Sequence, residues 1–588
     1  MRNAPRSLID VVTPTLRRPP AFGASALAIL TVIGCAAPWI FQGLDFTDDG
    51  FHLTNQQTLL RRTGIPAGSW GLLVWGSDLV GAGWMASPGG AGLLGARIGW
   101  VLLSVGTAAV SLRILARGCG AKRAAIAVAL AAPMLLAHGR MLIDYNGVPT
   151  LFMLLSIDAV GIGGQDPPPW RDVAAGVFLL LATMSRWPAA PTILAVGIVT
   201  LRSCPAANGR RRARGLRMAV GFVATALLGV MWLGASAHGR ELMAVAGFDE
   251  VRGTHAFGGL ARAVIRDGIS IVMVAAAGVV VARVLARARS TPRGIAVVTE
   301  ITFAAILSLT GTSIAADGPA TTAARWTIVL AGACVAVLRG ALIVRRNAAR
   351  AGTVPDERAA TASRLLLLGL VVGLAACVGS DTGFAKMNRG LWLAAPAAIL
   401  IGGDLVGRAG RWRSPARALV LGLALAGLAI RAVSSYRDGP DRLRLTATID
   451  HPRLRGIRTT PERARSVGEF VRALDGRVNV GDAVLAYGNT PLVQFLTEGA
   501  PALGHAWPDR LDAEEIGRRL ASLGRERPLP GIVVRARCNT NDPAWPDEGR
   551  AARAAIDHDE GRRLIDDWLV GHAYATVWAN SDFEILAR

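Results

Sequence analysis

Apolar stretches long enough to cross a lipid bilayer recur from Ala21 to Val433, and this feature most constrains the fold of the 588-residue chain. A helix needs about 20 apolar residues to span the hydrocarbon core. With 52% hydrophobic residues, the chain is too apolar for a soluble protein of this size. No such stretch occurs after Ser434. The sequence therefore predicts a helical membrane domain at 1–433 and a soluble C-terminal domain at 434–588.

The net charge of +22 raises the question of nucleic-acid binding. The arginine runs, however, lie between apolar stretches, as at 210–214 and 345–346. Positive charge in such loops marks the cytoplasmic side of a membrane protein, and it can also contact anionic lipids. We therefore expect membrane lipids as partners and no nucleic acid.

The six cysteines are scattered without disulfide or metal spacing.

The basic N-terminus and basic loops set the orientation in an inner membrane. The first span, 21–41, leads to a first outer loop at 42–90. Within this loop, 69–86 is interpreted as an interfacial or re-entrant helix, because a crossing there would leave Arg117, Lys122 and Arg123 outside. The result is about 13 crossings with the C-terminal domain outside. The predicted spans are 21–41, 91–116, 124–139, 146–163, 172–187, 190–201, 216–236, 267–285, 294–315, 326–343, 364–379, 390–407 and 416–433.

The C-terminal domain alternates short apolar runs with a helical pattern. Strands are predicted at 482–487, 531–534 and 574–578, and a helix at 513–523. This alternation indicates an α/β or α+β fold.

Carboxylates cluster directly after the first span, at Asp45, Asp48 and Asp49. Carboxylates near the hydrocarbon edge are costly unless they are hydrated, paired or used. In a helix that begins near Asp48, His52 would share a face with Asp48. Thr47 or Asp48 could cap this helix, but capping accounts for only one carboxylate of the cluster.

A second polar cluster at 138–146 joins two predicted spans and contains His138, Arg140, Asp144, Tyr145 and Asn146. One interpretation is structural, with Asp144 as a favourable acid at a helix N-terminus and Arg140 reaching toward lipid headgroups. The other is a functional site shared with the first cluster.

Together, the segment Asp48-Asp49-Gly50-Phe51-His52 and the pair Arg140 and Asp144 resemble membrane glycosyltransferases of the GT-C superfamily. The similarity is strongest to the protein O-mannosyltransferase and aminoarabinose-transferase branch, in which an acidic pair opens the first outer loop. This resemblance implies a GT-C-like membrane domain, a polyprenyl-phosphate-linked sugar as donor, and an acceptor that is a glycan, a lipid or a protein.

Such a transfer needs a base for the acceptor proton and cations for the departing phosphate. We expect Asp48 to be the base, with Asp49 or Asp144 orienting the acceptor. A divalent cation, Mg²⁺ or Mn²⁺, is an optional cofactor that Asp48 and Asp144 would hold. The expected substrate-binding residues are polar or cationic: His52, His138, Arg140, Tyr145, Asn146, Arg186, Lys386 and Arg389.

Two other classes of function stay open. A transporter or flippase would also use charged residues, but near the bilayer midplane. A non-catalytic envelope-assembly protein would tolerate neutral substitutions in the acidic loop. The loop at 237–266 is a lid or a solvated connector.

Overall fold

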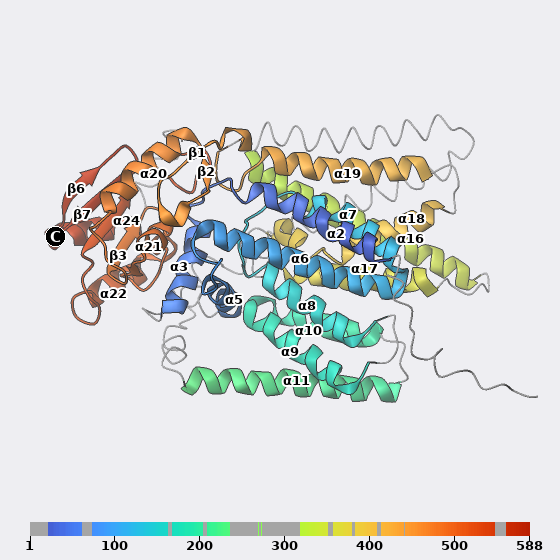
Figure 1. Cartoon of the computed structure of the whole chain (residues 1–588). Coiled ribbons are helices and arrows are strands. Elements are labelled where there is room, and N and C mark those ends of the chain that lie inside the picture. Colours follow the sequence, from blue (N-terminus) through green and yellow to red (C-terminus); the bar gives the residue numbers. More distant parts are fainter. Residues whose placement is uncertain are drawn as a thin grey trace, which may run out of the picture.

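The computed structural model describes residues 21–61, 73–162, 167–203, 208–235, 269, 272, 318–350, 357–378, 383–407, 413–439, 441–546 and 560–588. Long helices run side by side along one axis, and a sheet with its own helices lies at one end of them (Figure 1). The loop predicted at 237–266 and the spans at 267–285 and 294–315 fall outside the described residues, apart from positions 269 and 272.

Helices occur at each of the other predicted spans. They are α2 (Ala21–Ala36), α6 (Gly92–Cys119), α7 (Ala121–Leu135), α8 (Gly147–Val160), α9 (Pro169–Ser185), α10 (Ala190–Ser203), α11 (Asn208–Ala235), α16 (Gly318–Arg350), α17 (Glu357–Ala375), α18 (Ala394–Gly407) and α19 (Arg413–Val433). Short 3₁₀ turns, η1 (Ala37–Trp39), η2 (Trp187–Ala189) and η3 (Gly383–Arg389), extend or join them. The count of 13 crossings stays a prediction.

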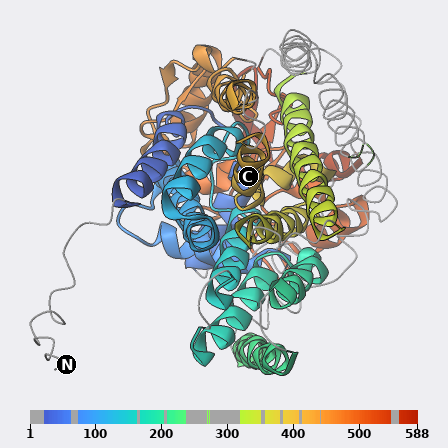
Figure 2. The ribbon, with the colours of Figure 1, turned by 90° about the vertical axis from the view of Figure 1, so that its right-hand side faces the viewer.

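Four of the described helices are long and apolar enough to cross a membrane: Gly92–Cys119, Gly209–Trp232, Arg325–Arg346 and Glu357–Ala375. Helix α11 lies at the periphery in the view along the bundle (Figure 2). Its large apolar side chains are exposed, including Leu227 at 59% and Val230 at 67%. Such a surface is stable in lipid and costly in water, so the helical part is a membrane domain.

Two helices lie at the end of the bundle that faces the sheet. Helix α3 (Asp48–Arg61) runs across the bundle axis, and α5 (Trp75–Met85) lies beside it (Figure 1). The 11 residues of α5 extend about 16 Å, which is shorter than the hydrocarbon core. The described part of the 69–86 segment is therefore too short to cross the membrane as a helix.

The C-terminal part is built on a five-stranded sheet in the order β4-β3-β5-β7-β6. Strand β3 pairs in parallel with β4 and β5, whereas β7 pairs antiparallel with β5 and β6. The strands are β3 (Ala483–Tyr487), β4 (Ala500–Pro501), β5 (Ile532–Ala536), β6 (Ala575–Ala579) and β7 (Phe583–Ala587). The predicted strands correspond to β3, β5 and β6. The mixed pairing agrees with the α/β or α+β prediction.

Helices cover both faces of this sheet, because successive strand residues point to opposite sides. Val484 and Val534 pack on the face of α20 (Pro461–Leu474), while Leu485 and Val533 pack with α22 (Ala513–Ser522) and α24 (Glu560–Gly571). The remaining short elements are α21 (Leu492–Thr497), β1 (Ala447–Thr448), β2 (Arg458–Thr459), η5 (Arg442–Arg444), η6 (Pro452–Leu454) and η7 (Pro508–Arg510).

The sheet domain docks on the first loop of the membrane domain. Leu44, Phe46 and Leu53 belong to the same hydrophobic core as α20 and the sheet. The backbone N–H of Leu492 donates to the Phe46 carbonyl at 3.0 Å. This interface buries polar side chains of α3, and hydrogen bonds across it compensate for their burial. Thr54 donates to the Pro491 carbonyl and Gln57 to the Gln494 carbonyl.

Candidate active site

The N-terminus of α3 is fixed by Asp45, three residues before the helix begins. The Asp45 carboxylate accepts hydrogen bonds from the Thr47 N–H at 2.9 Å, the Thr47 hydroxyl at 2.6 Å and the Asp49 N–H at 3.1 Å. The expectation that Thr47 or Asp48 caps the helix is therefore wrong. A carboxylate in this position satisfies amides that the first turn leaves unpaired. Because Asp45 does so, the Asp48 side chain is released for other contacts.

Asp48 is held by three residues that are distant in sequence. Its Oδ2 accepts a hydrogen bond from the Tyr436 hydroxyl at 2.6 Å and lies 3.1 Å from Nη2 of Arg437. Its Oδ1 lies 3.8 Å from Nη1 of Arg140. Burial alone would raise the pKa of Asp48, but the charges of Arg437 and Arg140 outweigh burial and hold the pKa well below its usual range. Asp48 is therefore a carboxylate at physiological pH.

Asp49 has a different environment from its neighbour. Its Oδ2 lies 3.4 Å from Nη2 of Arg97, and its Oδ1 has no hydrogen-bond partner among the described residues. Burial, reinforced by the charge of Asp45, raises the pKa of Asp49 to about 7. The side chain of Asp48 is 22% exposed and that of Asp49 only 4%, so Asp48 is the carboxylate that a substrate can reach.

The second cluster meets the first at Arg140. Nη2 of Arg140 lies 3.4 Å from Oδ2 of Asp144, while Nη1 faces Asp48. Asp144 also accepts from the Asn146 and Gly147 N–H groups at 3.0 and 2.9 Å, so its carboxylate satisfies the first amides at the start of α8, where Asn146 is the N-cap residue. Asp144 thus satisfies amides at the start of α8 and also faces Arg140 within the candidate site. A catalytic role for Asp144 stays a prediction.

Three cations surround the ring of Tyr145. The guanidinium carbons of Arg140 and Arg186 lie 5.3 and 5.0 Å from the ring centroid, and the Lys386 ammonium lies 5.4 Å from it. Lys386 also donates to the Tyr145 hydroxyl at 3.1 Å, and Arg186 donates to the Asn146 side chain at 2.8 Å. Nη1 of Arg140 has no hydrogen-bond partner among the described residues. The geometry leaves this buried donor available to an anion.

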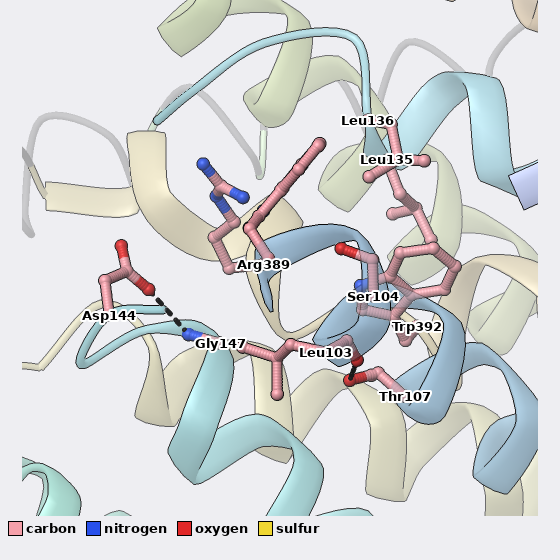
Figure 3. Close-up of a pocket in the computed structure, with 10 residues that line it drawn as sticks. Leu103, Ser104, Thr107, Leu135, Leu136, Asp144, Gly147, Arg389 and Trp392 are labelled. Atoms are coloured by element: carbon pink, nitrogen blue, oxygen red, sulfur yellow. Dashed lines mark hydrogen bonds between the residues drawn. The ribbon is translucent and has the colours of Figure 1, made fainter. Parts of the chain in front are cut away.

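Arg389 lines a small pocket beside Asp144, between α6, the end of α7 and the start of α8 (Figure 3). Its guanidinium donates to the Arg140 carbonyl at 2.7 Å. His138 lies nearby, with its ring 5.9 Å from that of Tyr436. Burial and the charges of Arg431 and Arg389 lower the pKa of His138 to about 3, so this histidine is neutral at physiological pH. The pocket is lined by Trp100, Leu103, Ser104, Thr107, Leu135, Leu136, Asp144, Gly147, Arg389 and Trp392.

His52 turns toward α5 and Tyr145. Its Nδ1 lies 3.4 Å from Oδ1 of Asp78, and its ring is 5.3 Å from that of Tyr145. Sequence reasoning did not single out Asp78, although a carboxylate within an apolar stretch is itself a functional signal.

Sequence reasoning also missed four residues that complete the site. Arg97 pairs with Asp49, and Arg431 is buried with two nitrogens that lack partners among the described residues. Tyr436 and Arg437 follow the last span in a short polar segment whose partners lie almost 400 positions away, and nothing in the local sequence reveals them.

The site does not suit the divalent cation considered for Asp48 and Asp144. Both carboxylates already face arginines, and further positive charge beside Arg437 and Arg140 would be repelled. Within the described ranges, no group of three or more His, Cys, Asp or Glu residues could hold a metal ion. No chemical step is therefore assigned to a metal.

No protein-family model and no curated protein matches the chain. Among solved structures, the chain is similar to ArnT from Cupriavidus metallidurans in the apo state, with a TM-score of 0.37, 14% sequence identity, and coverage of 96% of this chain and 97% of that chain. The same protein bound to undecaprenyl phosphate matches with a TM-score of 0.34 at the same identity and coverage.

Proposed function

We propose that the chain is a glycosyltransferase that moves a sugar from a polyprenyl phosphate to an acceptor at the outer face of the membrane. The observation that carries this proposal is a reachable carboxylate within a cluster of cations. Asp48 and Asp144 face Arg140, and Arg186, Lys386, Arg389 and Arg437 lie around them. Because the five cations outnumber the two carboxylates, the cluster carries net positive charge that can attract a phosphate group.

The charge pattern of α6 supports an outer-face site. Trp100 and Ser104 of this helix line the pocket beside Asp144, whereas Arg113 and Arg117 lie toward its other end and pair with Asp158. Basic residues at a helix end favour the cytoplasmic side. The end that contacts the site is then the outer one, where a polyprenyl phosphate can present its headgroup.

In the proposed reaction, Asp48 takes the proton of the acceptor hydroxyl or amine as that group attacks the sugar. The bond between the sugar carbon and the phosphate oxygen breaks, and the phosphate leaves with the bonding electrons. Arg140, with Arg186 and Lys386 across Tyr145, stabilises this developing charge. Attack from the side opposite the phosphate inverts the configuration of the sugar carbon.

Mass spectrometry of envelope glycans, lipids and proteins tests the proposal in cells with and without the gene. We expect one sugar-modified species to disappear on deletion, its polyprenyl-phosphate donor to accumulate, and the wild-type gene to restore both. Identical profiles in the two strains would contradict the proposed function.

A further inference from the structure

The segment Ser434–Gly439 joins α19 to the sheet domain and contributes two contacts to Asp48. The hydroxyl of Tyr436 and the guanidinium of Arg437 both reach Oδ2 of this carboxylate. We propose that Tyr436 and Arg437 are positioning residues that orient Asp48 for proton transfer, and that the sheet domain sets their position. This inference rests on the proposed function of Asp48.

The two oxygens of Asp48 have unequal surroundings. Oδ2 has two close partners, at 2.6 Å from Tyr436 and 3.1 Å from Arg437. Oδ1 faces Nη1 of Arg140 at 3.8 Å, beyond hydrogen-bonding distance. A carboxylate whose Oδ2 is fixed presents Oδ1 to the substrate. The acceptor proton is therefore assigned to Oδ1.

Arg437 connects the site to the sheet domain. Nη1 of Arg437 donates to the Thr47 hydroxyl at 2.5 Å and also to the Asn541 side chain, which follows β5. One guanidinium thus binds the catalytic carboxylate, the residue preceding it and the sheet domain. A movement of the loop around Asn541 would shift the guanidinium that orients Asp48.

The backbone at Arg437 is held in an unfavourable conformation. Its φ of 53° lies in the left-handed region, which costs a residue other than glycine about 1 kcal/mol or more. The next residue supplies the restraint: Asp438 accepts from Nη1 of Arg463 at 2.6 Å, from the Thr459 hydroxyl at 3.0 Å and from the Leu44 N–H. Because the sheet domain provides Arg463 and Thr459, its docking fixes the direction of the Arg437 side chain.

Other charges also act on Asp48. Arg140 and Lys386 attract the carboxylate from the membrane domain, and burial opposes its ionisation. Asp49 adjoins it on α3. Among all these charges, that of Arg437 contributes most to keeping the pKa of Asp48 low. Loss of Arg437 should therefore move the acidic limb of the pH–activity profile to higher pH.

Arg437→Asn is the decisive variant, because asparagine tolerates the left-handed conformation while it removes the charge. Arg437→Lys keeps a cation, and Tyr436→Phe removes only the hydroxyl bond. Arg444→Asn is the matched control, since Arg444 is an exposed arginine seven positions along the chain. Each purified full-length variant is added to membranes from gene-deleted cells, which supply the native donor and acceptor, and the product is scored by mass spectrometry.

We expect Arg437→Asn to lower transfer about tenfold to hundredfold, as misplacement of a catalytic group does. As pH is lowered, its remaining activity should begin to fall at a higher pH than that of wild type. Arg437→Lys should recover most of the activity and the wild-type profile, and Arg444→Asn should change neither. Tyr436→Phe should lose activity in the same direction as Arg437→Asn.

A double-mutant cycle of Arg437→Asn and Asp48→Asn in thermal unfolding tests the pairing without any activity measurement. We expect the shift in Tm of the double variant to differ from the sum of the single shifts. If the Tm shifts of the two single variants add up to that of the double variant, the positioning role is overturned. It is also overturned if Arg437→Asn transfers sugar at the wild-type rate with the wild-type pH profile. Full transfer by Asp48→Asn overturns the proposed function instead, so the two failures are distinguishable.

Discussion

Arg140 and Asp144, four positions apart in the loop between α7 and α8, form an ion pair with Nη2 of the arginine 3.4 Å from Oδ2 of the aspartate. The opposite nitrogen of the same guanidinium faces Asp48 at 3.8 Å. Two acidic clusters that lie about 100 positions apart in the sequence thus share one cation. Asp48 is the more exposed of the two carboxylates, and Asp144 is the one fixed by helix capping.

Replacement of Arg140 should weaken phosphate binding. In Arg140→Met we expect the affinity for the proposed polyprenyl-phosphate ligand to fall about tenfold or more, because hydrogen bonds to charged groups contribute about 1.5–3 kcal/mol. Binding is measured on protein in nanodiscs with a polyprenyl phosphate, and the uncharged polyprenol of the same chain length is the ligand control. Arg113→Met is the matched variant, since Arg113 pairs with Asp158 away from the site. Equal losses in both variants would contradict a role for Arg140 in phosphate binding.

The two roles of Asp144 can be separated by two substitutions. Asparagine also caps helices, whereas alanine does not and costs about 1 kcal/mol of stability. We therefore expect Asp144→Asn to unfold near the wild-type temperature and Asp144→Ala to unfold lower by about 1–2 °C, the shift that about 1 kcal/mol produces in a chain of this size. Both should lose transfer activity, because both release Arg140. Full transfer activity in Asp144→Asn would show that Asp144 stabilises the start of α8 and has no role in transfer.

Docking of the sheet domain depends on Gly50 in the first turn of α3. A Cβ added at this position would lie 2.3 Å from the backbone nitrogen of Leu492, which cannot move independently of α21. We expect Gly50→Ala to lower the Tm and the activity together, with an overpacking cost of about 1–3 kcal/mol. Gly517→Ala is the control, because a Cβ there meets nothing within 4 Å. It should leave stability unchanged or raise it slightly.

The pH dependence of protein stability should reveal the protonation of the Asp49 carboxyl in the folded state. Because burial raises its pKa to about 7, the folded state keeps a proton that the unfolded chain releases above pH of about 4. The contribution of this group therefore falls as pH rises from about 4 to 7. The pKa values of Asp48 and Asp144 are lowered, so their contributions change only below this window. In Asp49→Asn the decrease in Tm between pH 5 and pH 7.5 should be smaller than in wild type, and an unchanged slope would contradict the protonated state.

The sequence was sufficient for the helices at those predicted spans that the structure describes, since each depends on a local apolar run. It did not predict α20 or α24 of the C-terminal part. The sequence also located Asp48, Arg140, Asp144, Tyr145, Arg186, Lys386 and Arg389, because charges next to apolar spans are costly and therefore conspicuous. These residues do lie together in the structure. Their roles as base and substrate ligands remain proposals.

The contacts that orient Asp48 could not be predicted from the sequence. The bond from Tyr436 joins residues 388 positions apart, which only the tertiary fold brings together. The cap was misassigned for a related reason: Asp45 lies upstream of α3 and reaches its first amides through a loop whose conformation the sequence does not display. Local patterns thus identified the charged residues, and tertiary packing determined which of them meet.

The most direct test of the account compares Asp48→Asn with Asp45→Ala in transfer on membranes from gene-deleted cells, with protein amount and Tm measured alongside. Asp45 is buried and caps α3, whereas Asp48 is reachable and carries the proposed proton transfer. We predict that Asp48→Asn loses transfer about 100-fold or more while its Tm stays near that of wild type, and that Asp45→Ala changes mainly the Tm, because alanine cannot cap the helix. Transfer at the wild-type rate by Asp48→Asn would contradict the account.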